Sequence, residues 1–164
     1  MKFAEVFLFL NLILSISQSA CATNQDSAFD RAGFYQAMQS SNKELIDKEL
    51  NQLKDLEFPN KGAYVGALSM MKASFPATPS RKLNLFKSGH KQLEAAIRQD
   101  SLNAELRFLR LMIQENAPGF LGYKSDLQKD SAYIRKSFKA LPEVVQQAVL
   151  NYSKKSKILK PMDS

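Results

Sequence analysis

The stretch that decides the fold runs from Lys82 to Gln114, KLNLFKSGHKQLEAAIRQDSLNAELRFLRLMIQ. In its first half, side chains three or four residues apart would share one face of an α-helix; they are Leu83, Phe86, His90, Leu93 and Ile97. A turn follows over residues 100–103, and Asn103 is placed to cap a second helix. We therefore predict a helical hairpin.

The second helix of this hairpin, expected over residues 104–116, is apolar on nearly every side. Its apolar side chains are Leu106, Phe108, Leu109, Leu111, Met112 and Ile113. A helix that is hydrophobic all round is buried all round, so we predict that it lies at the centre of the molecule. Glu105 stands in its first turn, where a carboxylate interacts favourably with the helix dipole.

Periodic apolar residues and turn residues predict further helices on both sides of the hairpin. The expected bounds are 27–39, 42–55, 61–74, 81–99, 104–116 and 125–140, with a last helix opened by Pro142. The residues expected to cap them are Ser41 with Glu44, Asn60, Ser80, and Ser125 with Gln128. No stretch shows strand-like alternation with turn signals. We predict an all-α fold of six to seven helices in antiparallel pairs, arranged as an α-solenoid or as an irregular helical bundle.

Residues 1–22 have the order of a secretory signal peptide: a charged start, an apolar run over residues 6–14 and small residues near the end. The apolar run is too short to span a membrane. Residues 23–26 would then be a short connector, 27–157 a single domain and 158–164 a charged tail. We expect the protein to be exported, with a periplasmic location.

Cys21 is the single cysteine of the chain, so no internal disulfide forms and the fold must be held by packing. Two interpretations of its position remain open. Ala20 and Cys21 resemble the processing site of a lipoprotein, in which the cysteine carries lipid, although Gln18 stands where an aliphatic residue is usual. Alternatively, cleavage follows Ala22 and Cys21 is discarded with the leader. The first interpretation anchors the protein to a membrane and the second releases it.

A local resemblance to tetratricopeptide repeats covers residues 93–105. Ala96 stands at the small position of that repeat, and Ser101 stands where the motif prefers proline. The sequence then departs from the repeat, because Arg107 and Arg110 stand near the places of its Trp and Leu. The resemblance implies helices stacked in pairs. The expected α-solenoid would then be tetratricopeptide-like.

A wider resemblance spans most of the mature chain. The phrases over residues 82–91, 107–118 and 141–148 resemble a family of small exported helical proteins of Bacteroidetes bacteria. That family has no known activity. The resemblance therefore implies an exported location and a helical fold, and it implies no chemistry.

The formal net charge is +7, and it is unevenly distributed. Residues 124–160 carry nine Lys or Arg against three Asp or Glu, a net charge of +6. A basic C-terminal quarter can bind an anionic membrane or glycan surface, here through Lys154, Lys155 and Lys157. Nucleic acid is the least expected anionic partner of an exported protein.

His90 is the only histidine, which excludes sites built on two histidines, including the common zinc sites. Glu94 follows one helical turn later, a spacing that can orient a general base. No nucleophile, phosphate-binding loop or calcium loop accompanies this pair, so we favour a partly buried histidine satisfied by Glu94 or by a carbonyl group. We predict no catalytic residues, no cofactor and no metal site.

Arg107, Arg110 and Gln114 share one face of the apolar helix at spacings of three and four residues. In an antiparallel hairpin, Arg110 should pass close to Glu94. The structural interpretation is an ion pair with Glu94 and hydrogen bonds to helix-end carbonyl groups, because a buried arginine requires a partner. The functional interpretation is an arginine-lined groove that binds a carboxylate or a phosphate.

The loop over residues 120–123 places Phe120 and Tyr123 on either side of a leucine and a glycine. If exposed, these aromatic side chains would form an edge that binds a partner. We favour the alternative, in which Phe120 and Leu121 cover the end of the hairpin.

Together these features predict an exported helical module for protein–protein interaction or scaffolding at the cell envelope. It would bind a protein or peptide, with Arg107, Arg110, Gln114, Phe120 and Tyr123 as candidate binding residues. Two alternatives stay open. The first is a hydrolase or small-ligand-binding protein that uses His90, Glu94 and the two arginines. The second is a basic module on an anionic surface.

The leader generates the first test. Mass spectrometry of the protein purified from the cells that make it should show that Met1 and the apolar run are absent. A lipid-modified N-terminal Cys21 would support the anchored form, and an N-terminus directly after Ala22 would support the released form. A mature protein that retains Met1 would contradict the prediction of export.

Overall fold

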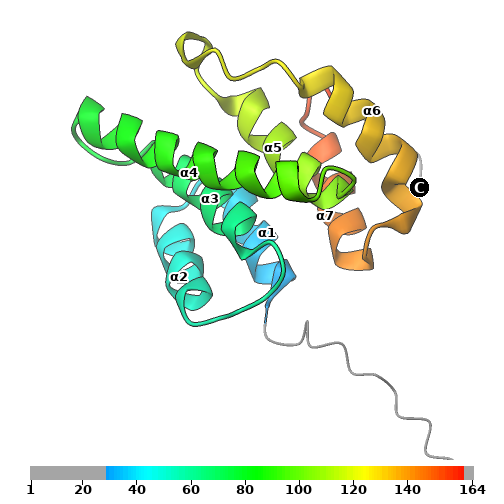
Figure 1. Ribbon diagram of the computed structural model, residues 1–164, viewed down its shortest axis with the longest axis horizontal. Coiled ribbons are helices and arrows are strands. Elements are labelled where there is room, and N and C mark those ends of the chain that lie inside the picture. The colour runs from blue at the N-terminus through cyan, green and yellow to red at the C-terminus, as the bar shows by residue number, and fades with distance from the viewer. Residues whose placement is uncertain (1–28, 161–164) are drawn as a thin grey trace, which may run out of the picture.

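The computed structural model describes residues 29–160 (Figure 1). The predicted signal peptide, Cys21 and the connector lie outside the described residues, as do residues 161–164 of the predicted tail. Within this range the chain forms seven α-helices and no strand, so the predicted all-α class is confirmed.

The seven helices are α1 Arg31–Ser40, α2 Lys43–Lys54, α3 Lys61–Lys72, α4 Pro79–Gln99, α5 Ala104–Asn116, α6 Leu127–Ser137 and α7 Glu143–Ser153. Two short 3-10 helices, η2 Gly119–Leu121 and η3 Phe138–Ala140, precede and follow α6. Each predicted pair is in contact: α1 with α2, α3 with α4, and α5 with α6. Helix α1 also contacts α7, whereas each unit of a linear repeat stack contacts only its neighbours. A tetratricopeptide-like arrangement remains a prediction.

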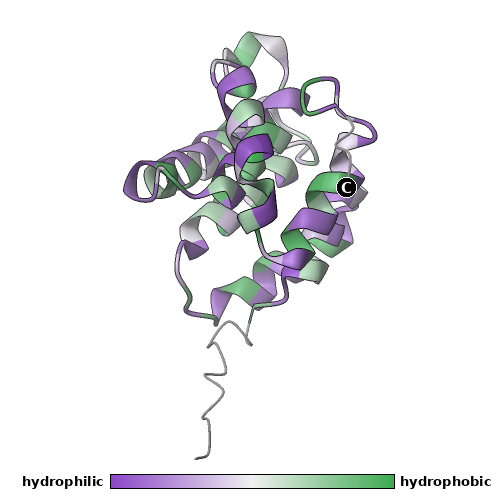
Figure 2. Cartoon of the chain, turned by 90° about the vertical axis from the view of Figure 1, so that its right-hand side faces the viewer, coloured by the Kyte–Doolittle hydropathy of each residue, from purple (hydrophilic) through white to green (hydrophobic). Residues whose placement is uncertain are grey.

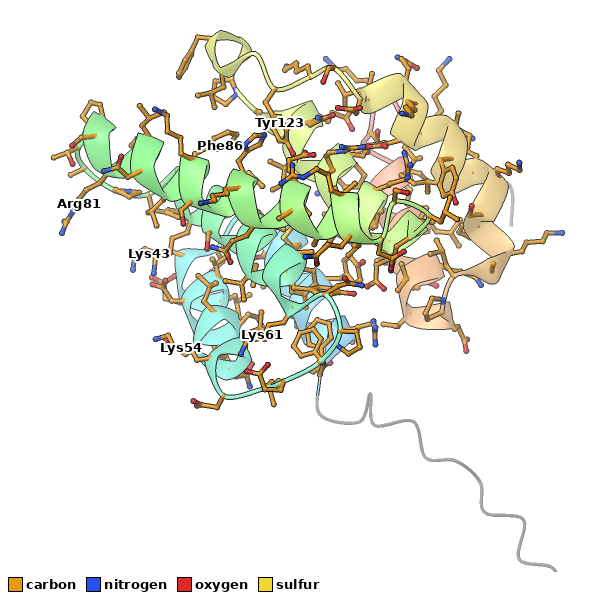
Figure 3. All side chains as sticks on the ribbon, in the orientation of Figure 1. Lys43, Lys54, Lys61, Arg81, Phe86 and Tyr123 are labelled. Atoms are coloured by element: carbon orange, nitrogen blue, oxygen red, sulfur yellow. The ribbon has the colours of Figure 1, made fainter. Side chains whose placement is uncertain are left out.

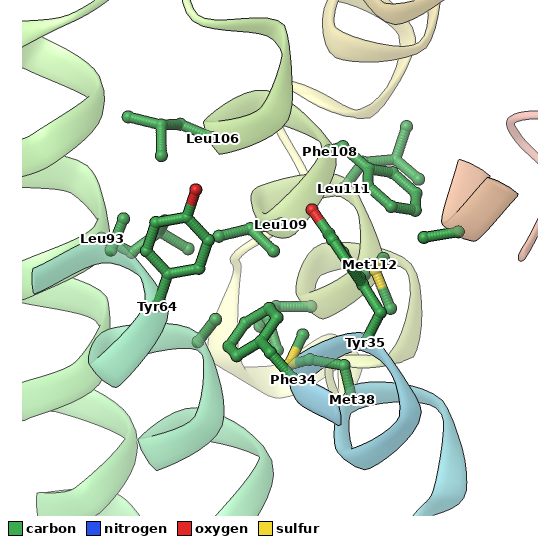
Figure 4. Close-up of a cluster of buried hydrophobic side chains, with 14 of the residues drawn as sticks. Phe34, Tyr35, Met38, Tyr64, Leu93, Leu106, Phe108, Leu109, Leu111 and Met112 are labelled. Atoms are coloured by element: carbon green, nitrogen blue, oxygen red, sulfur yellow. The ribbon is translucent and has the colours of Figure 1, made fainter. Parts of the chain in front are cut away.

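The central position predicted for the second helix of the hairpin is confirmed. Every residue of α5 from 104 to 114 is buried. Figure 4 shows Phe108, Leu109 and Met112 of α5 beside side chains of α1 and α3, among them Phe34 and Tyr64. Around this core the helices alternate hydrophilic and hydrophobic residues, as amphipathic helices do (Figure 2).

The hairpin turn is also formed as predicted. The Asn103 side-chain oxygen accepts hydrogen bonds from the backbone N–H groups of Glu105 at 3.0 Å and Leu106 at 3.2 Å. These bonds satisfy two of the donors that every helix start leaves unpaired.

The first helix begins later than the predicted residue 27. Phe29 is buried, with its ring stacked on Phe58 at 4.4 Å and edge-on to Tyr64 at 4.7 Å between ring centroids. Asp30 then caps α1, because its side chain accepts from the backbone N–H of Gly33 at 3.0 Å. The aromatic contacts of Phe29 thus precede the helix and place its start at Arg31.

None of the four other predicted caps forms as expected. Ser41 has a left-handed backbone with φ of 51°, and Asn42 caps α2 in its place. Helix α4 begins with a proline at its first position, where the missing N–H costs nothing, so Ser80 lies inside the helix.

Asp126 stands at the N-cap position of α6, and the hydroxyl group of Ser125 donates to its carboxylate. Asn60 stands at the predicted N-cap position of α3, but its side chain donates to Asp100 and forms no capping bond.

The most extensive helix contact, between α3 and α4, depends on two glycines that face each other. A Cβ atom added to Gly66 would lie 2.6 Å from the carbonyl oxygen of Gly89, and one added to Gly89 would meet the carbonyl oxygen of Gly66 and the side chain of Met70. Real side-chain atoms do not approach backbone so closely. The two helices therefore pack backbone against backbone at this crossing.

The C-terminal segment after α7 is part of the domain. The carboxylate of Glu115 accepts hydrogen bonds from the hydroxyl group of Ser156 and the backbone N–H of Lys157, both at 2.6 Å. Leu159 is completely buried. The predicted tail over residues 158–164 thus begins too early, because an apolar anchor follows the lysine-rich turn.

The glycine crossing generates the second test. Gly66→Ala should lower the free energy of unfolding by about 1–3 kcal/mol, because the added methyl group overpacks the contact of α3 with α4. Gly62→Ala is the matched control in the same helix, since nothing lies within 4 Å of its added Cβ. The control should be neutral or stabilising by up to about 1 kcal/mol. Urea unfolding of both variants measures the difference, and equal stabilities would show that the helices do not meet there.

Candidate binding groove

Two arginines of α5 converge on one aspartate of α6 inside the protein. Arg110 binds Asp130 through two parallel hydrogen bonds, from Nε to Oδ2 at 2.7 Å and from Nη2 to Oδ1 at 2.8 Å. Arg107 donates from Nη1 to the same Oδ1 at 3.1 Å. Asp130 is completely buried, Arg107 is 8% exposed and Arg110 is 6% exposed. Two-pronged arginine–carboxylate pairs are among the stronger charged hydrogen bonds.

The two arginines also reach α4 and the hairpin turn. Arg110 donates from Nη1 to Oε2 of Glu94 at 3.0 Å, which is the ion pair expected from the sequence. Arg107 donates to the carbonyl oxygen of Ser101 from Nε at 2.9 Å and from Nη2 at 2.6 Å. Its guanidinium carbon also lies 4.4 Å from the centre of the Tyr133 ring. The arginines are therefore held by the protein itself, as in the structural interpretation.

The environment of this network shifts the pKa of its members. Burial disfavours the charge of Arg110, but the hydrogen bonds and the charge of Asp130 raise its pKa above the usual value. Burial, followed by a hydrogen bond to Glu94, also raises the pKa of Tyr123. The Tyr123 hydroxyl group donates to Oε1 of Glu94 at 2.5 Å. The network thus keeps Arg110 charged and Tyr123 neutral.

Gln114 lies one turn beyond Arg110 and is completely buried. Neither polar atom of its side chain forms a hydrogen bond of ordinary geometry. Burial alone would raise the pKa of Asp126. The hydrogen bond from Ser125, the charge of Arg110 and the nearby Gln114 side chain outweigh burial, so the pKa of Asp126 is lowered. Gln114 thus belongs to the polar environment of the arginine network.

His90 packs among aromatic rings. Its ring meets Tyr123 edge-on at 4.5 Å and lies parallel to Phe86 at 6.4 Å between ring centroids. Figure 3 shows Phe86 of α4 next to Tyr123. The predicted partly buried position of His90 is confirmed. Of its two expected partners, Glu94 accepts hydrogen bonds from Arg110 and Tyr123 instead. Over residues 29–160, no group of three or more His, Cys, Asp or Glu side chains could hold a metal ion.

A groove of about 730 Å³ opens on the other side of α5. It is lined by the C-terminal ends of α1, α3, α5 and α7, by the N-terminal half of α4 and by the segment 117–121. Four methionines line it, and aliphatic and aromatic side chains complete most of the surface; among these residues are Met38, Met70, Met71, Met112, Leu83, Phe86, Ile113, Leu121 and Tyr152. This volume lies within the range of ligand-binding pockets in proteins.

Two large apolar side chains stand exposed at the rim of the groove. Phe120 of η2 is 87% exposed and Leu83 of α4 is 40% exposed. The prediction that Phe120 covers the end of the hairpin was therefore wrong; Leu121, half-buried, lines the groove beside it. Leu83 is exposed because the N-terminal half of α4 extends past the neighbouring helices (Figure 1).

The charged residues that line the groove are all basic. Lys82 stands in the first turn of α4, and Lys155 follows α7. The amine of Lys155 lies 5.5 Å from the centre of the Tyr152 ring, which holds it at the groove. Among residues 29–160, no Asp or Glu lines the groove, so the charges on its lining are positive.

The candidate binding residues thus divide between two places. Phe120 stands at the groove, whereas Arg107, Arg110, Gln114 and Tyr123 lie in the buried network. Sequence reasoning placed Met112 in the core, which its burial confirms, and did not identify the groove. One signal was present: three of the four groove methionines, Met38, Met70 and Met71, stand in the last turn of their helices.

Comparisons with known proteins do not identify a relative, so the interpretation of the groove depends on its geometry. No family model, no curated protein and no solved structure matches the chain. Across the described helices, none combines the length and the hydropathy that crossing a membrane requires.

The buried network generates the third test. Asp130→Asn should lower the free energy of unfolding by about 3–5 kcal/mol, because two arginines lose a shared buried counter-charge. Asp126→Asn is the matched control: its carboxylate lies 3.8 Å from the same Arg110 but is partly exposed, and its loss should cost about 1 kcal/mol or less. Urea unfolding measures both. If Asp130→Asn lowered the free energy of unfolding less than Asp126→Asn does, Asp130 would not be the residue that holds the arginines.

Proposed function

We propose that this protein is a helical binding module whose apolar groove receives an apolar segment of a protein partner. The observation that carries the proposal is the groove itself: about 730 Å³, methionine-lined, with Phe120 and Leu83 exposed at its rim. Exposed apolar surface next to a concave site is typical of protein interaction sites.

The side chains of the groove support a protein partner. Methionine is unbranched and polarisable, so a methionine-lined surface adapts to apolar side chains of different shape. The aromatic ring of Phe120 offers a large contact area at a small cost in conformational entropy, a feature of residues that contribute most to interface affinity.

The buried network supports a binding module over a hydrolase. Arg107 and Arg110 already have protein partners, and Glu94 already accepts two hydrogen bonds. The groove contains no pair of titratable groups arranged as acid and base, because its charged residues are two lysines. With the predicted leader, the proposal becomes an exported module that binds a protein at the cell envelope.

Site-specific photo-cross-linking tests the proposal. A photoreactive phenylalanine analogue replaces Leu83 or Phe120 in the full chain, expressed in the cells that make the protein. Both positions should give a discrete covalent adduct with a protein after illumination. Leu102 is the matched control, since it is 75% exposed in the turn between α4 and α5 and does not line the groove.

The adduct should be absent at the control position and should disappear when Phe120→Asp is combined with the label at Leu83. Equal labelling at all three positions, or no adduct from the groove, would contradict the proposal.

A further inference from the structure

The shape of the groove determines which backbone conformation a bound segment can adopt. A segment buried in an apolar groove must satisfy its own N–H and C=O groups or find partners for them. An extended peptide commonly finds partners at the edge of a β-sheet, and residues 29–160 contain no strand. A helix satisfies its own backbone groups, so a helix is the conformation that this groove can accommodate.

The groove is also formed by helices. Its sides include the N-terminal half of α4 and the C-terminal end of α5, whose side chains leave the spaces into which the ridges of another helix pack. Helix-in-groove recognition uses apolar anchors at positions i, i+3, i+4 and i+7. The groove methionines provide an adaptable surface for such anchors.

The charges at the groove select the polar face of the bound helix. Lys82 and Lys155 lie on different elements and both line the opening, and no acidic residue of the described part of the chain lines it. Acidic side chains on the bound helix would meet two cations, whereas basic ones would be repelled. The positive net charge of the whole chain acts in the same direction.

We propose that the groove binds an amphipathic α-helix that carries acidic residues beside its apolar anchors. The partner is thus a protein segment of negative charge, and the apolar face of that segment replaces water over the methionines. This inference rests on the proposed function of the groove and adds the conformation and the charge of the occupant.

A displayed peptide library tests the inference on the full chain. The library fixes leucine at positions i, i+3, i+4 and i+7 and leaves the remaining positions free to be acidic, basic or neutral. Selected peptides should be enriched in Asp and Glu, and their circular dichroism should gain helical signal on binding. Labelled synthetic copies then give the dissociation constants by fluorescence anisotropy.

Charge reversal in the groove provides the decisive comparison. The double variant Lys82→Glu with Lys155→Glu should bind the acidic peptides roughly tenfold more weakly, and replacing the peptide acids by lysine should restore affinity. Lys48→Glu with Lys139→Glu is the matched control, since both lysines are exposed, neither lines the groove and the change in net charge is the same. The control should bind within about twofold of the original protein.

The outcomes separate this inference from the proposed function. Selection of neutral or basic peptides whose binding is lost in the Phe120→Asp variant would support the groove as a protein-binding site. It would overturn the inference of an acidic helix. A complete lack of peptides that depend on Phe120 would overturn both. Binding of palmitate, a long-chain carboxylate, together with no selected helix would identify an acyl chain as the occupant and would also overturn the inference.

Discussion

The ion pair of Arg110 with Asp130 is the interaction on which the rest of the structure depends. Helix α5 is buried along residues 104–114 and yet carries two guanidinium groups, and a buried charge without a partner costs several kcal/mol. Asp130 can serve both arginines only if α6 lies directly against α5. Glu94 can reach Arg110 only if α4 lies on the adjacent side. The charges thus fix the neighbours of α5, while apolar burial supplies most of the stabilisation.

The groove follows from the way these contacts divide α4. Its C-terminal half is held by the glycine crossing with α3 and by the Glu94 ion pair with α5. Helix α4 has 21 residues and α5 has 13, so the N-terminal half of α4 extends past the end of its neighbour. Residues 77–84 are exposed as a result. The projecting half forms one side of the groove, and η2, after α5, contributes Phe120 to the opposite rim.

Much of the fold could be predicted because its signals are local. The hairpin, its Asn103 cap, the burial of α5 and the pair of Arg110 with Glu94 all depend on residues close in sequence. Asp130 could not be identified, because which side chain of α6 faces the arginines of α5 depends on how the two helices pack. The contact of Gly66 with Gly89 and the burial of Leu159 likewise depend on which faces meet. The groove was missed because side chains that line an open site have the same periodicity as core side chains.

An open groove has a cost that the rest of the chain must offset. Apolar surface left in contact with water forgoes about 25 cal/mol per Å² that its burial would contribute. Larger side chains at Ala73 and Ala117 could fill part of the space, and a polar residue in place of Phe120 would remove the exposed ring at the rim. The chain instead keeps small residues inside the groove and a bare aromatic ring at its edge. Because the buried ion pairs and the glycine crossing hold the helices in place without filling the groove, this surface is available to a partner whose own apolar face completes the packing.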